Sequence, residues 1–399
     1  MVLTPNQLSG GIKLYNQLLQ ETNNLQKSSY FRMDVTERLF LQESLLNIFK
    51  DINNRQDILS SMRIYINGEL LGENDVCKIG LFNQVPETFK GFKKWAKKVF
   101  GDNEFLILIN KAEIFHDPIA SHFSEKFQDI NDSIEGSPVH LEGTYFIGNS
   151  KYTPFGAHID EISNAYHYNL SEQERYMFLW DPETYEKERG SLQHLIDPSN
   201  ILQYAYKYVV EQHHAFFLPA QKYYHVGVNN DFTVSFALAL IKYDKPSFVK
   251  KVCNVFSEHI SKSIDLDSIL SGNPPIKDVN LNKYVEKYFL SLLSKGNFRA
   301  APKKIENVVI NHKNTLKRIQ PFQIQYCANG QKLDLFIRGY HTKLPNNKDI
   351  VQLVETINAV DKIKVNEVLC EFENKIGINL TKQLLEFFIK FKLLEVYNE

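Results

Sequence analysis

A histidine and an aspartate stand one residue apart in the apolar stretch FGAHIDEISNAYH, residues 155–167. Side chains alternate between the two faces of a strand, so His158 and Asp160 point to the same side if this segment is extended. A histidine from a neighbouring strand would complete three ligands on one face of a metal ion. The best candidate is His225 in FFLPAQKYYHVGV, where an apolar strand leads through a proline to aromatic residues.

Two imidazoles and one carboxylate on one face of Fe(II) leave positions open for a bidentate cosubstrate and dioxygen. An H-x-D pair alone is a weak signal, because it also occurs on polar strand surfaces and in turns. The downstream histidine makes the pattern more specific. We interpret His167 and His194 as ordinary structural histidines.

The composition limits the classes of function. The chain has 399 residues, of which 43% are hydrophobic, and this length favours two or three domains. It holds 46 Lys and Arg against 47 Asp and Glu, so net charge gives no reason to expect nucleic acid or an anionic membrane as partner. We see neither a secretory signal nor an apolar run long enough to span a membrane.

The cysteines indicate the redox environment. Cys77, Cys253, Cys327 and Cys370 are scattered and form no CxxC pair. This predicts neither a structural zinc site nor a disulfide framework. A reducing, cytoplasmic location is the simplest expectation.

The hydrophobic pattern predicts a β core with helices before and after it. VTERLFLQESLLNIFKDI has helical spacing, whereas EFLILIN, HLEGTYFIG, YMFLWD and FTVSFALALIKY read as short strands of a sandwich or barrel. Asn329-Gly330 marks a hairpin, which three predicted helices follow, as in a winged-helix module. The expected parts are a helical region (1–61), a barrel (62–245), a helical linker or dimerisation unit (246–320) and a winged-helix-like module (321–399).

The stretch TPFGAHIDEISNAYHYNLSEQERYMFLWDP resembles the central motif of the JmjC/cupin branch of the Fe(II)- and 2-oxoglutarate-dependent oxygenases. It is similar to the asparaginyl hydroxylase that acts on hypoxia-inducible factor and to the bacterial ribosomal oxygenases. FFLPAQKYYHV resembles their second-histidine strand, and the resemblance covers about residues 140–242. It implies a double-stranded β-helix (jelly-roll) core, Fe(2+), 2-oxoglutarate and O2.

The resemblance also implies roles for single residues. The metal ligands would be His158, Asp160 and His225. Arg175 would pair with the distal carboxylate of 2-oxoglutarate, and Asn164 would lie near its metal-proximal end. Further contacts to the cosubstrate would come from Thr153, Tyr145 and Ser235. The chain departs from the family in its longer spacing between His158 and Arg175 and in Ser171 and Gly143, where members have Gly and Asn.

Arg175 has an independent physical reason for this role. A buried carboxylate needs a paired cation, and a guanidinium group offers it two parallel hydrogen bonds. The alternative is that Arg175 is a solvated charge at the edge of a strand.

The leading hypothesis is a dioxygenase that hydroxylates a side chain of a protein or a ribosomally synthesised peptide. The layout of a barrel, a helical unit and a winged helix resembles that of ribosomal oxygenases, which would allow a homodimer. Residues 321–399 hold ten basic and ten acidic residues, which does not favour DNA binding. The alternatives are a non-catalytic binding or regulatory protein, and a cupin isomerase or dioxygenase that does not use 2-oxoglutarate.

Overall fold

The computed structural model describes residues 6–7, 14–52, 59, 61–72, 75, 79–81, 85–130, 138–190, 196–257, 281–306 and 308–397. The chain divides into two compact units. Unit 1 comprises Met1–Ser133 and His140–Lys242, and unit 2 comprises Ile134–Val139 and Tyr243–Glu399. The four-part division expected from the sequence stays a prediction.

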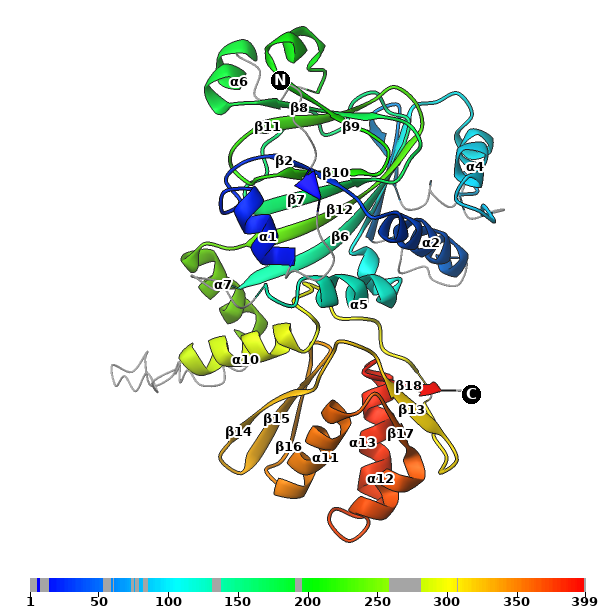
Figure 1. Ribbon diagram of the computed structural model, residues 1–399, viewed down its shortest axis with the longest axis vertical. Helices are drawn as coiled ribbons and strands as arrows, with labels where there is room; N and C mark the ends of the chain where they lie inside the picture. The colour runs from blue at the N-terminus through cyan, green and yellow to red at the C-terminus, as the bar shows by residue number, and fades with distance from the viewer. Residues whose placement is uncertain are drawn as a thin grey trace, which may run out of the picture. The chain divides into compact units, whose positions relative to one another are not determined.

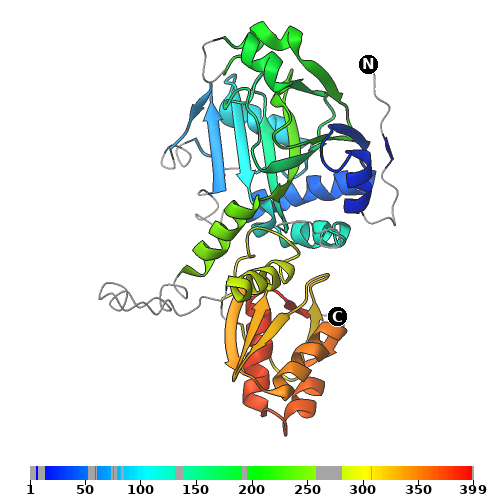
Figure 2. The same cartoon turned by 90° about the vertical axis from the view of Figure 1, so that its left-hand side faces the viewer.

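Unit 1 is built on two sheets (Figures 1 and 2). The larger sheet has nine strands in the order β1 (Asn6–Gln7), β2 (Ser29–Arg32), β10 (His214–Leu218), β7 (Ser163–Asn169), β12 (Thr233–Lys242), β6 (Val139–Gly148), β5 (Phe105–Asn110), β3 (Met62–Ile66) and β4 (Glu69–Leu70). The smaller sheet has the order β11 (Tyr224–Asn229), β8 (Arg175–Trp180) and β9 (Tyr206–Val210). Pairing is antiparallel from β2 to β12, from β6 to β4 and throughout the smaller sheet.

The two sheets bury their inner faces against each other. One core cluster takes residues from β7, β8, β9 and β10, namely Ala165, Met177, Leu179, Val210, Phe216 and Leu218. On β7, Tyr166 and Tyr168 point to the opposite face, where they contact rings of Phe31 and Phe123. We call the space between the inner faces the barrel interior. The alternation therefore assigns every second residue of β7 to this interior.

Helices cover the outer faces of the sheets. Figure 1 shows α1 (Leu14–Glu21), α2 (Val35–Ile52) and α5 (Asp117–Lys126) beside the larger sheet. The phenyl ring of Phe123 on α5 stacks on that of Phe236, with centroids 5.5 Å apart. On the smaller sheet, α6 (Pro182–Glu188) and the 3-10 helix η3 (Ser199–Tyr204) bury Tyr185 and Ile201 against Trp180.

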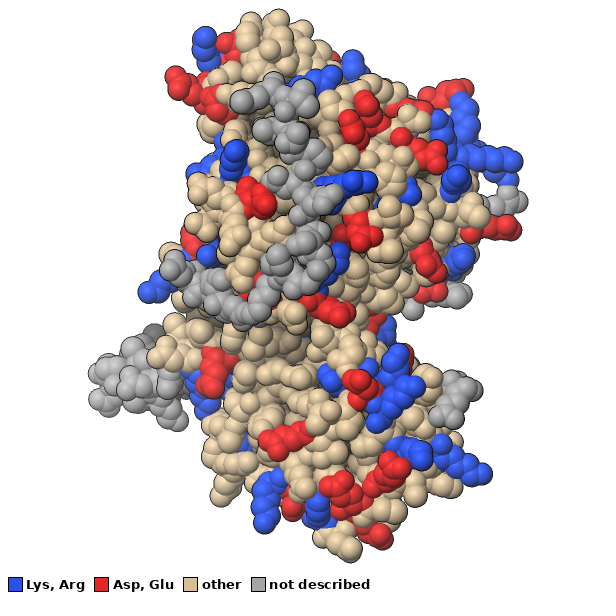
Figure 3. Space-filling view, viewed as in Figure 1, with Lys and Arg blue, Asp and Glu red and all other residues tan. Residues whose placement is uncertain are grey.

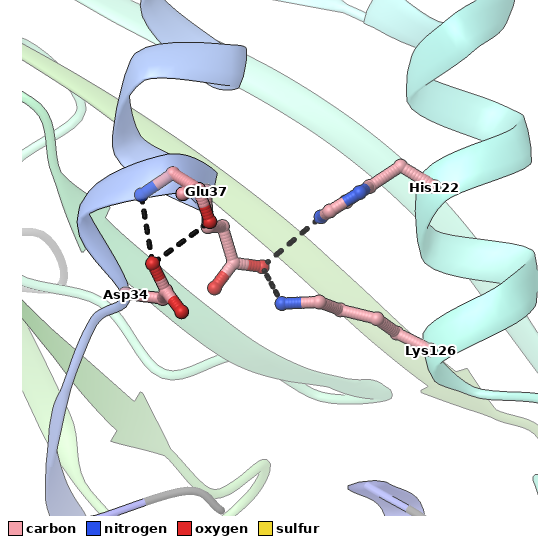
Figure 4. A network of polar contacts seen from close by, with 5 residues as sticks. Asp34, Glu37, His122 and Lys126 are labelled. Carbon is pink, nitrogen blue, oxygen red and sulfur yellow. Dashed lines mark hydrogen bonds and ion pairs between the residues drawn. The ribbon is translucent and has the colours of Figure 1, made fainter. Parts of the chain in front are cut away.

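A buried carboxylate joins α2 to α5 (Figure 4). Glu37 is 6% exposed, and one of its carboxylate oxygens accepts hydrogen bonds from His122 Nε2 at 3.3 Å and Lys126 Nζ at 2.7 Å. Asp34 caps the start of α2 by accepting a hydrogen bond from the Thr36 amide at 2.7 Å. Burial raises the pKa of Glu37, but the hydrogen bonds from His122 and Lys126 outweigh it and lower that pKa.

The structure confirms the prediction of a β core with helices around it, but it corrects two details. The region predicted as helical before residue 61 contains β2, which extends the larger sheet. The region predicted as strands also contains α4 (Gly91–Phe100), α5 and α6. The amphipathic pattern of α4 buries Phe92 and Trp95 against Phe49. Residues 8–13 of the predicted helical region and residues 258–280 of the predicted helical linker lie outside the described residues, as do Cys77 and His194.

Unit 2 combines helices with two small sheets. Its helices are α7 (Lys245–Val255), α10 (Leu281–Leu293), α11 (Lys348–Ala359), α12 (Val365–Phe372) and α13 (Ile378–Lys390). One sheet has the order β14 (Gln325–Asn329), β15 (Lys332–Ile337) and β16 (Tyr340–Pro345), and the other has the order β17 (Lys362–Lys364), β13 (Thr315–Arg318) and β18 (Leu394–Tyr397). The hairpin at Gly330 and the three helices after it are present as predicted.

A buried ion pair ties α10 to β15 within unit 2. Asp334 is 0% exposed, and its two carboxylate oxygens accept hydrogen bonds from Lys287 Nζ at 2.7 Å and His341 Nε2 at 2.6 Å. Burial raises the pKa of Asp334, but the hydrogen bonds from Lys287 and His341 outweigh it and lower that pKa. Both oxygens of this carboxylate therefore have protein partners.

Two further observations concern the described part of the chain. None of its helices combines the length and the apolar character needed to cross a membrane. Cys253, Cys327 and Cys370 form no disulfide within it.

Candidate metal centre

Among the described residues, one cluster of His, Cys, Asp and Glu brings its ligand atoms close enough to share a metal ion. It consists of His158, Asp160 and His225, whose ligand atoms all lie within 4.8 Å of one another. The Nε2 atom of His158 is 3.9 Å from Oδ1 of Asp160, and the two imidazole centroids are 4.3 Å apart. The structure thus brings together the three residues that the sequence singled out as ligands.

Backbone pairing positions the two histidines. His158 and His225 exchange two backbone hydrogen bonds, of 3.1 and 2.8 Å, as an isolated antiparallel bridge. A second bridge joins Tyr152 to Val228. The chain between Tyr152 and His158 is longer than the facing stretch of β11, so it bulges, and Gly156 supplies the positive φ of 66° that the bulge needs.

The hydrogen bonds orient the ligands. Nδ1 of His158 donates to the carbonyl of Gly156 at 3.0 Å, which leaves Nε2 free to bind a metal. The amide of Gln221 donates to the carbonyl of Asp160 at 2.8 Å and so ties this segment to the turn before β11. The side chains of His158 and Asp160 are 30% and 29% exposed, whereas His225 is 5% exposed. The centre is therefore open to solvent on one side only.

The electrostatics of the three side chains suit a cation. Burial raises the pKa of Asp160, although the nearby His158 lowers it. Burial, and then the positive charge of His158, lower the pKa of His225 well below its usual value. A neutral imidazole is the form that binds a metal, and a cation would compensate the buried carboxylate. The N, N, O donor set with one open side fits ferrous iron.

Arg175 lies in the barrel interior on β8. It is 5% exposed, and its Nη1 donates to the hydroxyl of Ser235 on β12. A Cβ atom at Gly227, on the adjacent strand β11, would be 2.7 Å from Nη2, so the glycine makes room for the guanidinium. Burial lowers the pKa of Arg175 to about 10. This buried cation faces no carboxylate among the ion pairs of the described residues, as a site for an anion would require.

Other polar atoms near Arg175 also lack a partner. Within the described part of the chain, no group hydrogen-bonds to Nε of Arg175, Oγ1 of Thr153 or Oδ1 of Asn229. Asn229 is opposite Arg175 in the β11–β8 register. Thr153 follows the bridge between Tyr152 and Val228. Because side chains alternate along a strand, the side chain of Thr153 points to the same side as Gly227. Buried polar groups are normally satisfied, so this concentration of unsatisfied atoms indicates a polar ligand.

The structure does not bring Tyr145 and Asn164 to this side. The hydroxyl of Tyr145 donates to the carbonyl of Leu41 at 2.8 Å, and its ring contacts Phe236 on the outer face of the larger sheet. Asn164 is paired with Leu240 and shares that outer face, where its side-chain amide bonds the backbone of Leu240 and Ala220. The strand register thus contradicts the expected cosubstrate contacts, and we place neither residue in the site.

The sequence analysis interpreted His167 as an ordinary structural histidine, and the structure shows where it lies. It lies on β7 opposite Ala237 and Phe216, on the inner face of the sheet. Burial, followed by the charges of Arg175 and His158, lowers its pKa to about 3, so the ring is neutral. The sequence carries a signal for this placement. Tyr166 and Tyr168 alternate with Ala165, His167 and Asn169, which indicates that His167 lies on the opposite face of the strand from the two tyrosines.

Comparison with known proteins identifies relatives by fold. No protein-family model matches the chain, and no curated protein matches it. Among solved structures, it is similar to YcfD, a ribosomal oxygenase from Escherichia coli, in complex with cobalt and succinic acid, with 10% identity, a TM-score of 0.51 and coverage of 96% of this chain and 99% of that one. A second structure of YcfD gives 10% identity, a TM-score of 0.51 and coverage of 96% and 98%.

At this identity, the likeness concerns the fold. It extends over nearly the whole of both chains, so it includes unit 2 as well as the barrel. The resemblance to the JmjC/cupin ribosomal oxygenases that the sequence motifs predicted is therefore confirmed as a similarity of fold.

Proposed function

We propose that this chain is an Fe(II)- and 2-oxoglutarate-dependent dioxygenase that hydroxylates a side chain of a protein or ribosomally made peptide. The observation that carries the proposal is the convergence of His158, Asp160 and His225 on one point, with ligand atoms within 4.8 Å of one another. The fold agrees with it, because the similar YcfD is a ribosomal oxygenase whose structure holds cobalt and succinic acid.

The three ligands would hold the metal, and ferrous iron would supply the centre at which O2 is activated and 2-oxoglutarate is decarboxylated to succinate and CO2. His158 is pre-oriented by its bond to Gly156, so its Nε2 needs little reorganisation. His225 is buried, which excludes water from its side of the centre. The exposed side at His158 and Asp160 is where a substrate side chain would enter.

Arg175 and Ser235 would bind the distal carboxylate of 2-oxoglutarate. The guanidinium is held in place by Ser235, and its Nε has no hydrogen-bond partner among the residues that the structure describes. Ferrous iron and Arg175 are positive and Asp160 is negative, so the remaining positive charge matches the 2-oxoglutarate dianion. Thr153 would add a hydroxyl contact from the segment that leads to His158. This arrangement fixes the orientation of the cosubstrate relative to the metal.

The macromolecular substrate is inferred from unit 2. The hairpin β14–β15 with α11, α12 and α13 has the content of a winged-helix module, which can bind peptides. Acidic and basic side chains are interspersed over the face of unit 2 seen in Figure 3, which favours a peptide over a nucleic acid. In the same proposal, α7 and α10 form a dimerisation unit and the protein acts in the cytoplasm.

Substitution of the ligands tests the proposal. His158→Ala and Asp160→Ala should each lower succinate formation from 2-oxoglutarate by more than about 100-fold, because losing a ligand should exceed the effect of losing an outer partner. His312→Ala removes an exposed histidine of unit 2 and is the matched control. Undiminished succinate formation in both ligand variants would refute the assignment of the centre.

Binding measurements separate the alternative functions. An oxygenase of this class should bind Mn(II) without oxygen and then bind N-oxalylglycine, a mimic of 2-oxoglutarate. A cupin enzyme that does not use 2-oxoglutarate should bind the metal only, and a non-catalytic protein should bind neither.

A further inference from the structure

His167 has unusual surroundings for a histidine. The residue is partly exposed, but both of its ring nitrogens are buried, and neither Nδ1 nor Nε2 has a hydrogen-bond partner within the part of the chain that the structure describes. Its ring is tilted relative to that of Phe146, with centroids 6.4 Å apart, so the two rings are not stacked. A core histidine normally bonds at least one of its nitrogens to the protein.

The strand register places His167 beside the proposed cosubstrate site. On β12 it is paired with Ala237, whose methyl group leaves space on the inner face. Ser235, the partner of Arg175, is two residues away from Ala237 and so lies on the same face. His167 therefore shares the inner face of the larger sheet with Ser235, which bonds Arg175, the proposed distal anchor.

We propose that His167 is a cosubstrate-binding residue. When 2-oxoglutarate lies between the metal and Arg175, the imidazole of His167 donates an N–H hydrogen bond to one of its carboxylate oxygens. The inference rests on the proposed function. It gives His167 the contact with the cosubstrate that the sequence resemblance assigned to Asn164. Because Asn164 faces the other side of β7, the polar contact from this strand must come from an inward residue. The inward residues are Ser163, Ala165, His167 and Asn169. The amide of Asn169 already bonds the carbonyls of Gln173 and Val210. Ser163 is paired with Ile241, six residues along β12 from Ser235, whereas His167 is paired with Ala237, only two residues from Ser235.

A neutral donor suits this position. The charges of the metal centre, Arg175 and the dianion already balance, so a second cation in the barrel interior would be buried without a partner. A neutral imidazole adds a hydrogen bond and no charge. It also selects for a ligand oxygen at this point, because a ligand without one would leave the N–H unsatisfied.

The test compares His167→Phe, which keeps a ring without the N–H, with His167→Asn, which keeps an N–H donor. Binding of 2-oxoglutarate is measured by calorimetry with Mn(II) in place of iron and without oxygen, so that no turnover occurs. The phenylalanine variant should bind 2-oxoglutarate about 10–100-fold more weakly, and the asparagine variant should recover most of the loss. Affinity for Mn(II) alone should stay within about twofold in both variants.

Tyr166→Phe is the matched control. Tyr166 is the neighbouring residue on β7, and its buried hydroxyl also lacks a partner among the described residues, but it points to the outer face. This variant should bind 2-oxoglutarate like the unmodified protein. Equal binding by His167→Phe and the unmodified protein would overturn the inference for His167 alone. Failure of the unmodified protein to bind 2-oxoglutarate after binding Mn(II) would instead refute the proposed function.

A second measurement covers the case in which His167→Phe does not fold. In protein labelled with 15N-histidine and loaded with diamagnetic Zn(II), addition of 2-oxoglutarate should shift an imidazole N–H resonance that is absent from His167→Asn. If that resonance does not respond to saturating 2-oxoglutarate, the proposed hydrogen bond does not exist.

Discussion

Each of the two units contains a cluster of titratable side chains with buried polar atoms, and the clusters differ in which groups form hydrogen bonds to those atoms. In unit 2, Asp334 accepts hydrogen bonds from both Lys287 and His341. In unit 1, Arg175 is also buried, but Ser235 is its only hydrogen-bond partner among the described residues, and neither nitrogen of His167 has one. The protein itself supplies the partners of the first cluster, whereas under the proposed function an anion would supply those of the second.

The difference teaches how to separate a structural cluster from a binding site. A buried pair that is already satisfied contributes to folding, and removing one partner leaves an uncompensated charge. A buried cation without a counter-charge costs stability in the free protein, and this cost is offset only when a ligand binds. Mutations at Asp334 should therefore lower stability and leave ligand binding unchanged, whereas mutations at Arg175 should weaken ligand binding and leave stability unchanged or higher.

The largest effect is expected for Arg175→Met. Loss of the guanidinium should weaken 2-oxoglutarate binding by about 100-fold or more, because a paired buried carboxylate would lose its cation. The free protein should melt at the same or a higher temperature, since a buried charge without a counter-ion is removed. Calorimetry and thermal unfolding measure the two effects, and Arg63→Met, at an exposed position of β3, is the control. A marked drop in melting temperature would mean that Arg175 is structural.

Asp334→Asn should show the opposite behaviour. The variant leaves Lys287, which is 6% exposed, without its counter-charge, and should lower the free energy of unfolding by about 3–5 kcal/mol. Binding of Mn(II) and 2-oxoglutarate in unit 1 should not change at temperatures where the protein is folded. The control is Glu367→Gln, because both members of its ion pair with Lys364 are largely exposed. A variant as stable as the control would show that the cluster contributes nothing to folding.

Gly227→Ala sharpens the comparison from within the site. The added Cβ would be 2.7 Å from Nη2 of Arg175, so the guanidinium must shift while its charge remains. The KM for 2-oxoglutarate should rise about tenfold, because the carboxylate anchor is displaced. An unchanged KM measured by succinate formation would contradict the position assigned to Arg175.

Glu37→Gln tests whether the effect of a mutation depends on the hydrogen-bond partners of the buried group or on the unit in which it lies. Glu37 lies in unit 1, like Arg175, but it has partners within the protein, like Asp334. The loss of charge should lower the free energy of unfolding at pH 7 by about 1 kcal/mol and leave 2-oxoglutarate binding unchanged. The folded-state pKa of Glu37 is lowered, so its contribution is complete above the unfolded value near 4.3 and is lost as the pH falls through the folded pKa. Unfolding curves of variant and unmodified protein should converge below about pH 4.

Some elements and residues were predictable because they depend on local patterns. The helical spacing of residues 35–52 predicted α2 with the bounds Val35–Ile52, and Asn329-Gly330 marked the hairpin of β14 and β15. His158, Asp160 and His225 were found because few residue types bind ferrous iron. α4 was missed because it lies within a run of strands and shows its pattern over only a few turns.

The sequence by itself indicated candidate residues of the types that bind a metal and an anion, and that strands would carry them, since residue type and period-two alternation are local properties. Only the tertiary structure decided which of these residues share a face. A shift of one residue in register exchanges the two faces of a strand. The pairing of β7 with β12 therefore turns Asn164 outward and His167 inward, and the pairing of β8 with β11 sets Arg175 beside Gly227. Such pairings join residues far apart in the chain, and they depend on the packing of both sheets around one interior.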